Sequence, residues 1–220
     1  MSKLSLSADE MLLVNDSSWI ISKHKVIKKV YDFFGDLLLR FEEEVKNYWH
    51  LFPENIKYLN GKISRGENYR LLPYVILDYP AFFWKENILA IRTMFWWGNF
   101  FSITLQLSGN HKDRFTKNRN EIFPWLKKYG YSICTAEGEW EHHFGEDNYK
   151  AAIDLDVQEY SEILQKEFFK ISKSIPLTEW NNAEIFLTDS FLEILNFLKL
   201  SFPGDEKDLS PASPITGSDL

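Results

Sequence analysis

The residues best suited to chemistry in this sequence lie in one short stretch, at positions 137–144 (Glu-Gly-Glu-Trp-Glu-His-His-Phe). If this stretch is a strand, Glu139, Glu141 and His143 project from the same face, because side chains alternate along a strand. Two carboxylates and an imidazole on one face could bind a divalent metal, or could supply a general acid and a base. The pattern therefore predicts a candidate catalytic site.

A second interpretation of the same stretch is purely structural. Asp154 and Asp156 on the following segment could complete an acidic site with the three residues above. Alternation of charged and apolar residues is, however, also typical of any antiparallel strand that has one face in solvent. A hydrolase or metal-assisted enzyme and a plain solvated face both remain open.

Arg92 marks a second candidate site. A two-residue turn at Gly98-Asn99 would place Arg92 opposite Leu105, on a face that is otherwise apolar. An unpaired guanidinium would be costly there, so we expect it to have a carboxylate partner. Asp78, near the end of the preceding predicted strand, is the nearest candidate in the sequence.

Aromatic residues around Arg92 suggest a ligand pocket. Arg92 is predicted to bind an anion inside an aromatic cavity made by Tyr74, Trp84, Trp96 and Phe101. The alternative is a structural ion pair, or an arginine that reaches past the edge of the sheet to water.

The elements that must position these residues can be placed from periodicity. Apolar residues at intervals of three and four predict a long helix over about residues 22–48, and Ser7 with Glu10 can begin a short helix before it. Alternation and turn residues predict strands, and helical spacing returns towards the C-terminus. Strands are expected at 70–79, 88–97, 100–108, 131–136, 139–144 and 149–155, a loop at 60–68, and further helices at 111–129, 157–172 and 190–200.

This order of elements predicts an α+β fold. We expect N-terminal helices, a central antiparallel sheet built on hairpins, and C-terminal helices packed on the sheet. Residues 1–202 are expected to form a single globular domain, because 220 residues suffice for one core. Residues 203–220 are rich in Pro, Gly, Ser and acids, and are expected to be a disordered tail.

Composition limits the compartment and the partners. Cys134 is the only cysteine, and acids interrupt the apolar residues near the N-terminus, so we expect a cytoplasmic protein without an export signal. No apolar run is long enough to predict a membrane span. The formal net charge of −7 makes nucleic acid an unlikely partner. A basic stretch containing Lys112, Arg114, Lys117 and Arg119 keeps a nucleic-acid accessory role as a third hypothesis.

Familiar catalytic motifs are missing from the sequence. It has no glycine-rich phosphate loop, no Gly-x-Ser-x-Gly elbow and no His-Glu-x-x-His zinc motif. The leading hypothesis is a non-catalytic binding or interaction protein with a protein or small-molecule ligand, without a cofactor or a metal. The alternative is the hydrolase or metal-assisted enzyme based on the acidic and histidine cluster. The oligomeric state stays open.

Overall fold

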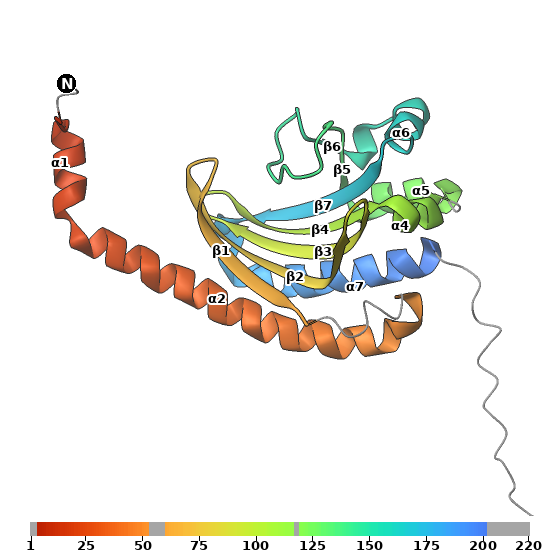
Figure 1. Cartoon of the computed structure of the whole chain (residues 1–220), viewed down its shortest axis with the longest axis horizontal. Coiled ribbons are helices and arrows are strands. Elements are labelled where there is room, and N and C mark those ends of the chain that lie inside the picture. The colour runs from red at the N-terminus through yellow and green to blue at the C-terminus, as the bar shows by residue number, and fades with distance from the viewer. Residues whose placement is uncertain (1–3, 53–59, 117–118, 202–220) are drawn as a thin grey trace, which may run out of the picture.

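A seven-stranded antiparallel sheet organises the chain. The computed structural model describes residues 4–52, 60–116 and 119–201, so the tail predicted at 203–220 lies outside the described residues. The strand order is β1-β2-β3-β4-β7-β5-β6 (Figure 1). The strands are β1 (Lys62–Tyr69), β2 (Leu72–Trp84), β3 (Asn87–Trp96), β4 (Phe100–Ser108), β5 (Ser132–Cys134), β6 (Tyr149–Ala151) and β7 (Phe168–Pro176).

Helices cover one face of this sheet. α2 and α7 run side by side beneath it in Figure 1, which confirms the predicted α+β class with helices at both ends of the chain. Within the described ranges, no helix is both long and apolar enough to cross a membrane. The helices are α1 (Ala8–Asn15), α2 (Ser17–Val45), α4 (Gly109–Thr116), α5 (Arg119–Tyr129), α6 (Val157–Ile163) and α7 (Ala183–Ser201).

The predicted apolar stripe of α2 forms the middle of the core. Asp16 caps the helix by accepting from the backbone N–H groups of Ser18 and Trp19. One face of α2 is then buried against the sheet and α7, and the ring of Phe41 stacks on Phe191 of α7 at a centroid distance of 3.7 Å. The buried residues of the stripe are Ile27, Val30, Phe34, Leu37, Phe41 and Val45.

The turn between β3 and β4 has three residues, and this reverses the predicted faces of β3. Trp96 pairs with Phe100 across Trp97, Gly98 and Asn99, and Gly98 adopts a φ of 71°. Arg92 is therefore opposite Thr104, and the predicted pairing with Leu105 is wrong. A shift of one residue moves every side chain to the other face. Ile91 and Phe95 of β3 face the helices, whereas Arg92 faces away from them.

Other segments also differ from the predictions. β1 occupies most of the predicted loop at 60–68, and β7 replaces the second half of the helix predicted at 157–172. Residues 139–144 form an irregular loop and not a strand. β2 continues through Trp84, past a register shift between Asp78 and Ala81, so the aromatic residues of 82–84 belong to a strand.

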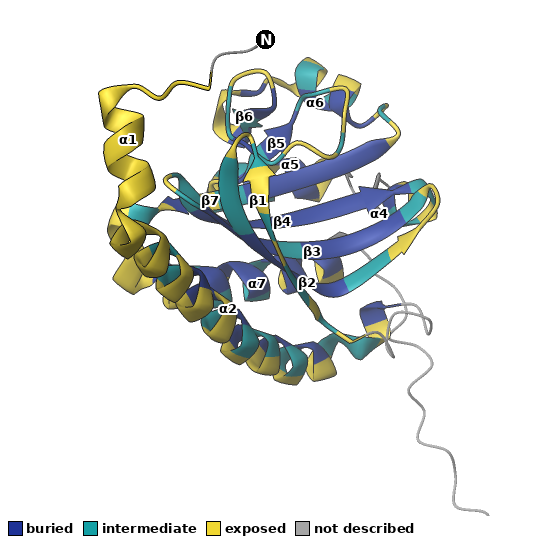
Figure 2. Cartoon of the chain, turned by 60° about the vertical axis from the view of Figure 1, so that its left-hand side comes forward, coloured by how far each residue is buried: buried dark blue, intermediate teal, exposed yellow. Residues whose placement is uncertain are grey.

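Burial follows this architecture. The central strands are buried in Figure 2, whereas α1 and the beginning of α2 are exposed. On the face opposite the helices, the loop of residues 135–148 crosses the sheet from β5 towards β2. Phe144 in this loop packs edge-on against Phe100 of β4 at 5.1 Å, and Trp140 lies 6.3 Å from the ring of Phe83 on β2. The loop therefore covers only part of that face.

Candidate functional site

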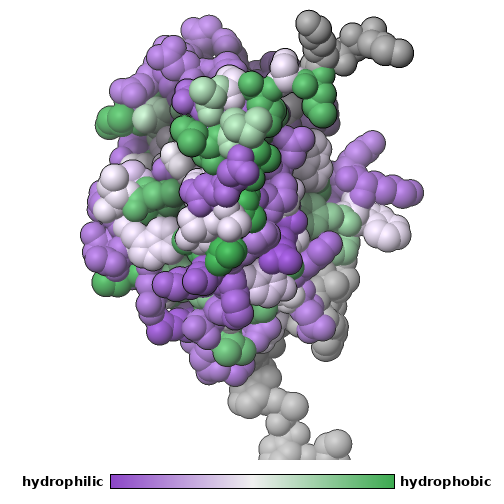
Figure 3. Space-filling view, turned by 90° about the vertical axis from the view of Figure 1, so that its left-hand side faces the viewer, coloured by the Kyte–Doolittle hydropathy of each residue, from purple (hydrophilic) through white to green (hydrophobic). Residues whose placement is uncertain are grey.

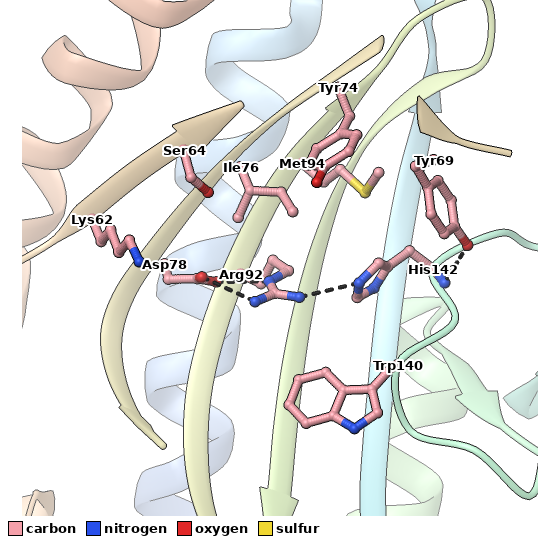
Figure 4. Close-up of a pocket in the computed structure, with 10 residues that line it drawn as sticks. All are labelled: Lys62, Ser64, Tyr69, Tyr74, Ile76, Asp78, Arg92, Met94, Trp140 and His142. Atoms are coloured by element: carbon pink, nitrogen blue, oxygen red, sulfur yellow. Dashed lines mark hydrogen bonds and ion pairs between the residues drawn. The ribbon is translucent and has the colours of Figure 1, made fainter. Parts of the chain in front are cut away.

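A pocket of about 320 Å³ opens on the part of the sheet that neither helices nor the loop cover. The strand register explains which side chains form it, since directly paired residues share a face. Paired rows cross β1, β2 and β3, and Trp140 and His142 of the 135–148 loop form the wall facing Lys62 and Ser64 (Figure 4). The rows are Lys62–Asp78–Arg92, Ser64–Ile76–Met94 and Gly66–Tyr74–Trp96.

Arg92 is fixed at the floor of the pocket by its cross-strand neighbour. Its Nε and Nη2 donate to the two carboxylate oxygens of Asp78 at 2.7 and 2.9 Å. Its Nη1 donates to Nε2 of His142 at 3.1 Å, and the guanidinium lies 5.8 Å from the centre of the Phe83 ring. The predicted Asp78 partner of Arg92 is confirmed. The guanidinium is therefore oriented before any ligand arrives.

His142 is held as a neutral imidazole. Arg92 can only donate, so Nε2 of His142 accepts and the ring proton belongs on Nδ1. Burial lowers the pKa of His142 to about 2, and the positive charges of Lys170 and Arg92 act in the same direction. His142 consequently presents a fixed tautomer and no charge at neutral pH.

The loop that carries His142 is tied to the sheet by buried polar side chains. Nζ of Lys170 on β7 donates to the carbonyl oxygen of Glu139 at 2.8 Å and to that of Glu141. Beside it, Gln106 of β4 donates to the Glu139 carboxylate at 2.8 Å. Lys170 is fully buried, and burial lowers its pKa to about 8. The loop is thus anchored through its backbone.

Tyr69, at the end of β1, secures the same loop from the other side. Its hydroxyl accepts from the backbone N–H groups of His142 and His143 at 2.7 and 3.1 Å, and donates to the Glu141 carboxylate at 3.0 Å. Trp96 supports Tyr69, because its indole N–H donates to the Tyr69 carbonyl at 3.2 Å and the rings meet edge-on. Both ends of the pocket wall are therefore fixed.

Several polar groups at the pocket have no partner. In the described part of the chain, the side chains of Lys62, Ser64 and Tyr74 form no hydrogen bond or ion pair, yet all three line the pocket. Ile76 and Met94 form an apolar floor of the pocket, next to these three polar side chains. Gly66 leaves room for Tyr74, since a Cβ at this glycine would lie 2.5 Å from the Tyr74 ring. The pocket combines side chains that can donate hydrogen bonds with an apolar surface.

The predicted catalytic residues do not converge on this pocket or on a site of their own. Glu139 is engaged by Gln106, and Glu141 accepts from Tyr69 and lies 3.7 Å from Nε of Arg70. Among the described residues, no group of three or more His, Cys, Asp or Glu side chains is arranged to hold a metal ion. The Asp156 carboxylate accepts from the Glu159 N–H and so caps α6, and it does not contact the three predicted catalytic residues.

His143 is occupied on both ring nitrogens. The backbone N–H of Gly145 donates to Nδ1 at 3.1 Å, and Nε2 lies 2.8 Å from Nη2 of Arg70 and 3.5 Å from the Glu141 carboxylate. The side chain is 7% exposed, so little of it can meet a substrate. His143 and Glu141 do lie together as predicted, but as part of the loop's internal packing.

The predicted ligand residues are divided by the structure. Arg92 and Tyr74 line the pocket, and Trp96 lies beside Tyr74 in the same row without lining it. Trp84 is exposed at the end of β2, and Phe101 is buried in the core on the helix side of the sheet. Sequence reasoning missed the lining residues of β1 because it predicted a loop there. It also missed the contribution of His142 and Trp140, whose only signal was their alternation with the predicted catalytic residues.

Comparison with family models, with curated proteins and with solved structures finds no match for this chain.

Proposed function

We propose that this protein is a non-catalytic binding protein whose pocket over β1, β2 and β3 takes a small organic anion with an apolar body. The observation that supports it best is the combination of an oriented guanidinium with unpartnered polar side chains around one cavity of about 320 Å³. Ligand sites typically combine an apolar lining with a few placed polar groups in this way.

Charge favours an anionic ligand. Asp78 balances the charge of Arg92, while Lys62 in the same row has no acidic partner among the described residues. The row therefore carries one unbalanced positive charge. Arg92 keeps N–H groups beyond the three that it uses, and the hydroxyls of Ser64 and Tyr74 can donate as well. A carboxylate placed among them would receive several charge-assisted hydrogen bonds.

The rest of the lining favours an apolar body on that ligand. Ile76 and Met94 form a floor without polar atoms that need partners, and Tyr69, Tyr74 and Trp140 stand around it. Apolar surface removed from water contributes about 25 cal/mol per Å². A carboxylate that carries an aliphatic or aromatic group uses both halves of the pocket.

The hydrolase or metal-assisted alternative has less support. Glu139, Glu141 and His143 already contact protein groups, and none of them lines the pocket shown in Figure 4. A general base needs a nitrogen or oxygen within reach of the substrate's proton. The geometry of these three residues is that of a folded loop.

The test is a comparison of matched ligands. Thermal shift and calorimetry would be measured with hexanoate and 3-phenylpropanoate, and with the corresponding neutral amides, since a ligand that binds the native state raises its stability. We expect the carboxylates to bind and the amides to bind about tenfold more weakly, as expected for loss of one charge-assisted contact.

Variants assign the binding to the pocket. Lys62→Gln and Tyr74→Phe are expected to weaken carboxylate binding, whereas Lys199→Gln, an exposed lysine at the end of α7, is the matched control and should bind as the wild type does. Equal binding of amide and carboxylate, or carboxylate binding that survives Lys62→Gln, would contradict the proposal.

A further inference from the structure

The N-terminal arm, defined here as residues 4–29, presents apolar side chains to solvent outside the body of the protein. α1 buries no residue at all, and it extends with the first turns of α2 beyond the sheet (Figure 1). Apolar groups gather on this side of the molecule (Figure 3). The exposed apolar residues of the arm include Met11, Leu12, Leu13, Val14, Trp19 and Ile20, which are 42% to 72% exposed.

The arm continues the buried stripe of α2. Ile27 is buried against the sheet, and Ile20 occupies the same face of the helix two turns earlier. Ile20 is nevertheless 42% exposed, because the helix has run past the edge of the sheet. The core therefore ends before the apolar stripe does.

α1 exposes apolar residues on every side. Residues 11–14 are four consecutive apolar residues, so they point in all directions around the helix, beside the polar Asp9, Glu10 and Asn15. A helix as short as α1 is not stable alone in water. It requires cover from another surface.

Charges along the arm are separated by sign. The free end carries only acids, Asp9, Glu10 and Asp16, and the part next to the body carries only bases, Lys23, Lys25, Lys28 and Lys29. Lys25 and Lys29 have no acidic partner in the described ranges, whereas Lys23 and Lys28 pair with Glu67 and Asp32. An arm with this order is complementary to itself when a second arm runs in the opposite direction.

We propose that the arm is a self-association surface, on which two copies of this chain pair their arms antiparallel about a two-fold axis. Leu12, Leu13, Trp19 and Ile20 of the two copies form the apolar centre, and the acidic end of each arm meets Lys25 and Lys29 of the other. The contact is isologous, so it closes as a dimer and does not propagate.

A membrane surface is the less favoured occupant. Amphipathic helices that lie on membranes have one strongly apolar face and a basic opposite face. In α1 the apolar residues lie on every side, and Asp9 and Glu10 would be repelled by anionic lipids, as would a chain with a net charge of −7. The second copy satisfies both the apolar residues and the acids.

The experiment is sedimentation of the full chain over a micromolar concentration series. The wild type is expected to be a dimer. Leu13→Glu with Ile20→Glu should be a folded monomer, since both side chains are exposed and their replacement removes no core contact. Leu39→Glu, at a 66% exposed position of α2 outside the arm, is the matched control and should remain dimeric.

Charge reversal tests the antiparallel arrangement. Asp9→Lys should weaken the dimer, and Lys25→Glu should do the same. Glu10 is left unchanged because its carboxylate accepts from the Ser7 N–H in the capping box of α1. The two substitutions in one chain should restore the dimer, because the new lysine of each arm then meets the new glutamate of the other. A monomeric wild type, a dimer that survives Leu13→Glu with Ile20→Glu, or a double reversal as weak as the single variants would overturn the proposal. Pelleting of the wild type with phosphatidylserine vesicles, abolished by Leu13→Glu, would assign the arm to a membrane instead and overturn it too.

Discussion

Asp78 and Arg92 lie directly opposite each other on β2 and β3, and the carboxylate holds the guanidinium through both of its oxygens. Their side chains are 11% and 15% exposed, so the pair is mostly removed from water. The pair sets the direction in which Arg92 presents its remaining N–H groups to the pocket. Its loss should affect both stability and binding.

Asp78→Asn is expected to destabilise the protein by about 2 kcal/mol. This is less than the roughly 3 to 5 kcal/mol typical of a broken buried pair, because both side chains keep some contact with water. Equilibrium unfolding in urea measures the change. The double variant Asp78→Asn with Arg92→Gln should lose less than the sum of the two single losses, since no uncompensated charge remains. Strict additivity would show that the pair does not act as a unit.

His142 should contribute acid sensitivity. Its pKa is lowered from 6.5 to about 2 in the folded state, so between these values the unfolded chain binds a proton that the folded chain does not. The free energy of unfolding therefore falls as the pH decreases below about 6.5, by at most about 1.4 kcal/mol per pH unit from this residue. His142→Gln should reduce this slope. In the wild type, NMR signals of the His142 ring should not titrate between pH 5 and 7, and a full titration there would refute the assignment.

Lys170 should contribute a dependence at alkaline pH. Its pKa is lowered from 10.5 to about 8, so the unfolded chain binds more protons than the folded chain between these values. Its contribution to the free energy of unfolding therefore rises with pH above about 8. Comparing the wild type with Lys170→Met across pH 7 to 10 measures this contribution. The comparison includes the effect of Lys170 on Cys134, whose pKa is raised by burial and which interacts with Lys170 electrostatically.

Lys170→Met should also loosen the 135–148 loop. The variant removes the donor to the carbonyl oxygens of Glu139 and Glu141, so those oxygens lose a buried partner. Hydrogen exchange of the loop amides is expected to accelerate, while the amides of β3 and β4 keep their protection. Unchanged exchange in the loop would show that Lys170 is not its anchor.

Two glycine substitutions should act in opposite directions. Gly66→Ala places a methyl group against the Tyr74 ring, so it should displace that ring and weaken carboxylate binding. Gly35→Ala meets no atom within 4 Å inside α2, and should stabilise the protein by up to about 1 kcal/mol through helix propensity. Thermal unfolding and calorimetry measure the pair. A stabilising Gly66→Ala that leaves binding intact would disprove the role of the close contact with Tyr74.

The sequence predicted the elements with strong periodicity and missed those with mixed signals. The α2 stripe and the bounds of β4 at 100–108 follow from repeated apolar spacing, and the structure confirms them. β1 contains Gly66 and Asn68, which are typical of loops, and only the pairing with β2 makes it a strand. In β7, Phe168 and Ile171 extend the apparent helical stripe of α6, so local spacing could not separate the two elements.

Predicting the candidate site requires the correct register between β3 and β4, which differs from the predicted register by one residue. Gly98 and Asn99 indicated the β3–β4 turn, but whether Trp97 belongs to the turn is decided by the geometry of the hairpin. The predicted two-residue turn places Arg92 on the core face, which is wrong, whereas the predicted partner Asp78 is correct. The 135–148 loop could not have been placed at all, since its position depends on Lys170, Gln106 and Tyr69 from three different strands.

The bonds that hold the 135–148 loop on the sheet are made mainly to its backbone, whereas the pocket is lined by its side chains. Lys170 and Tyr69 bind backbone carbonyl oxygens and N–H groups of the loop, which are present whatever the side chain, except that proline has no N–H. Trp140 and His142, in contrast, line the pocket with their side chains. Under the proposed function, substitutions at these two positions should change which anions bind while the loop keeps its conformation. Natural or directed evolution of a new ligand preference should therefore change Trp140 and His142 with the smallest loss of stability.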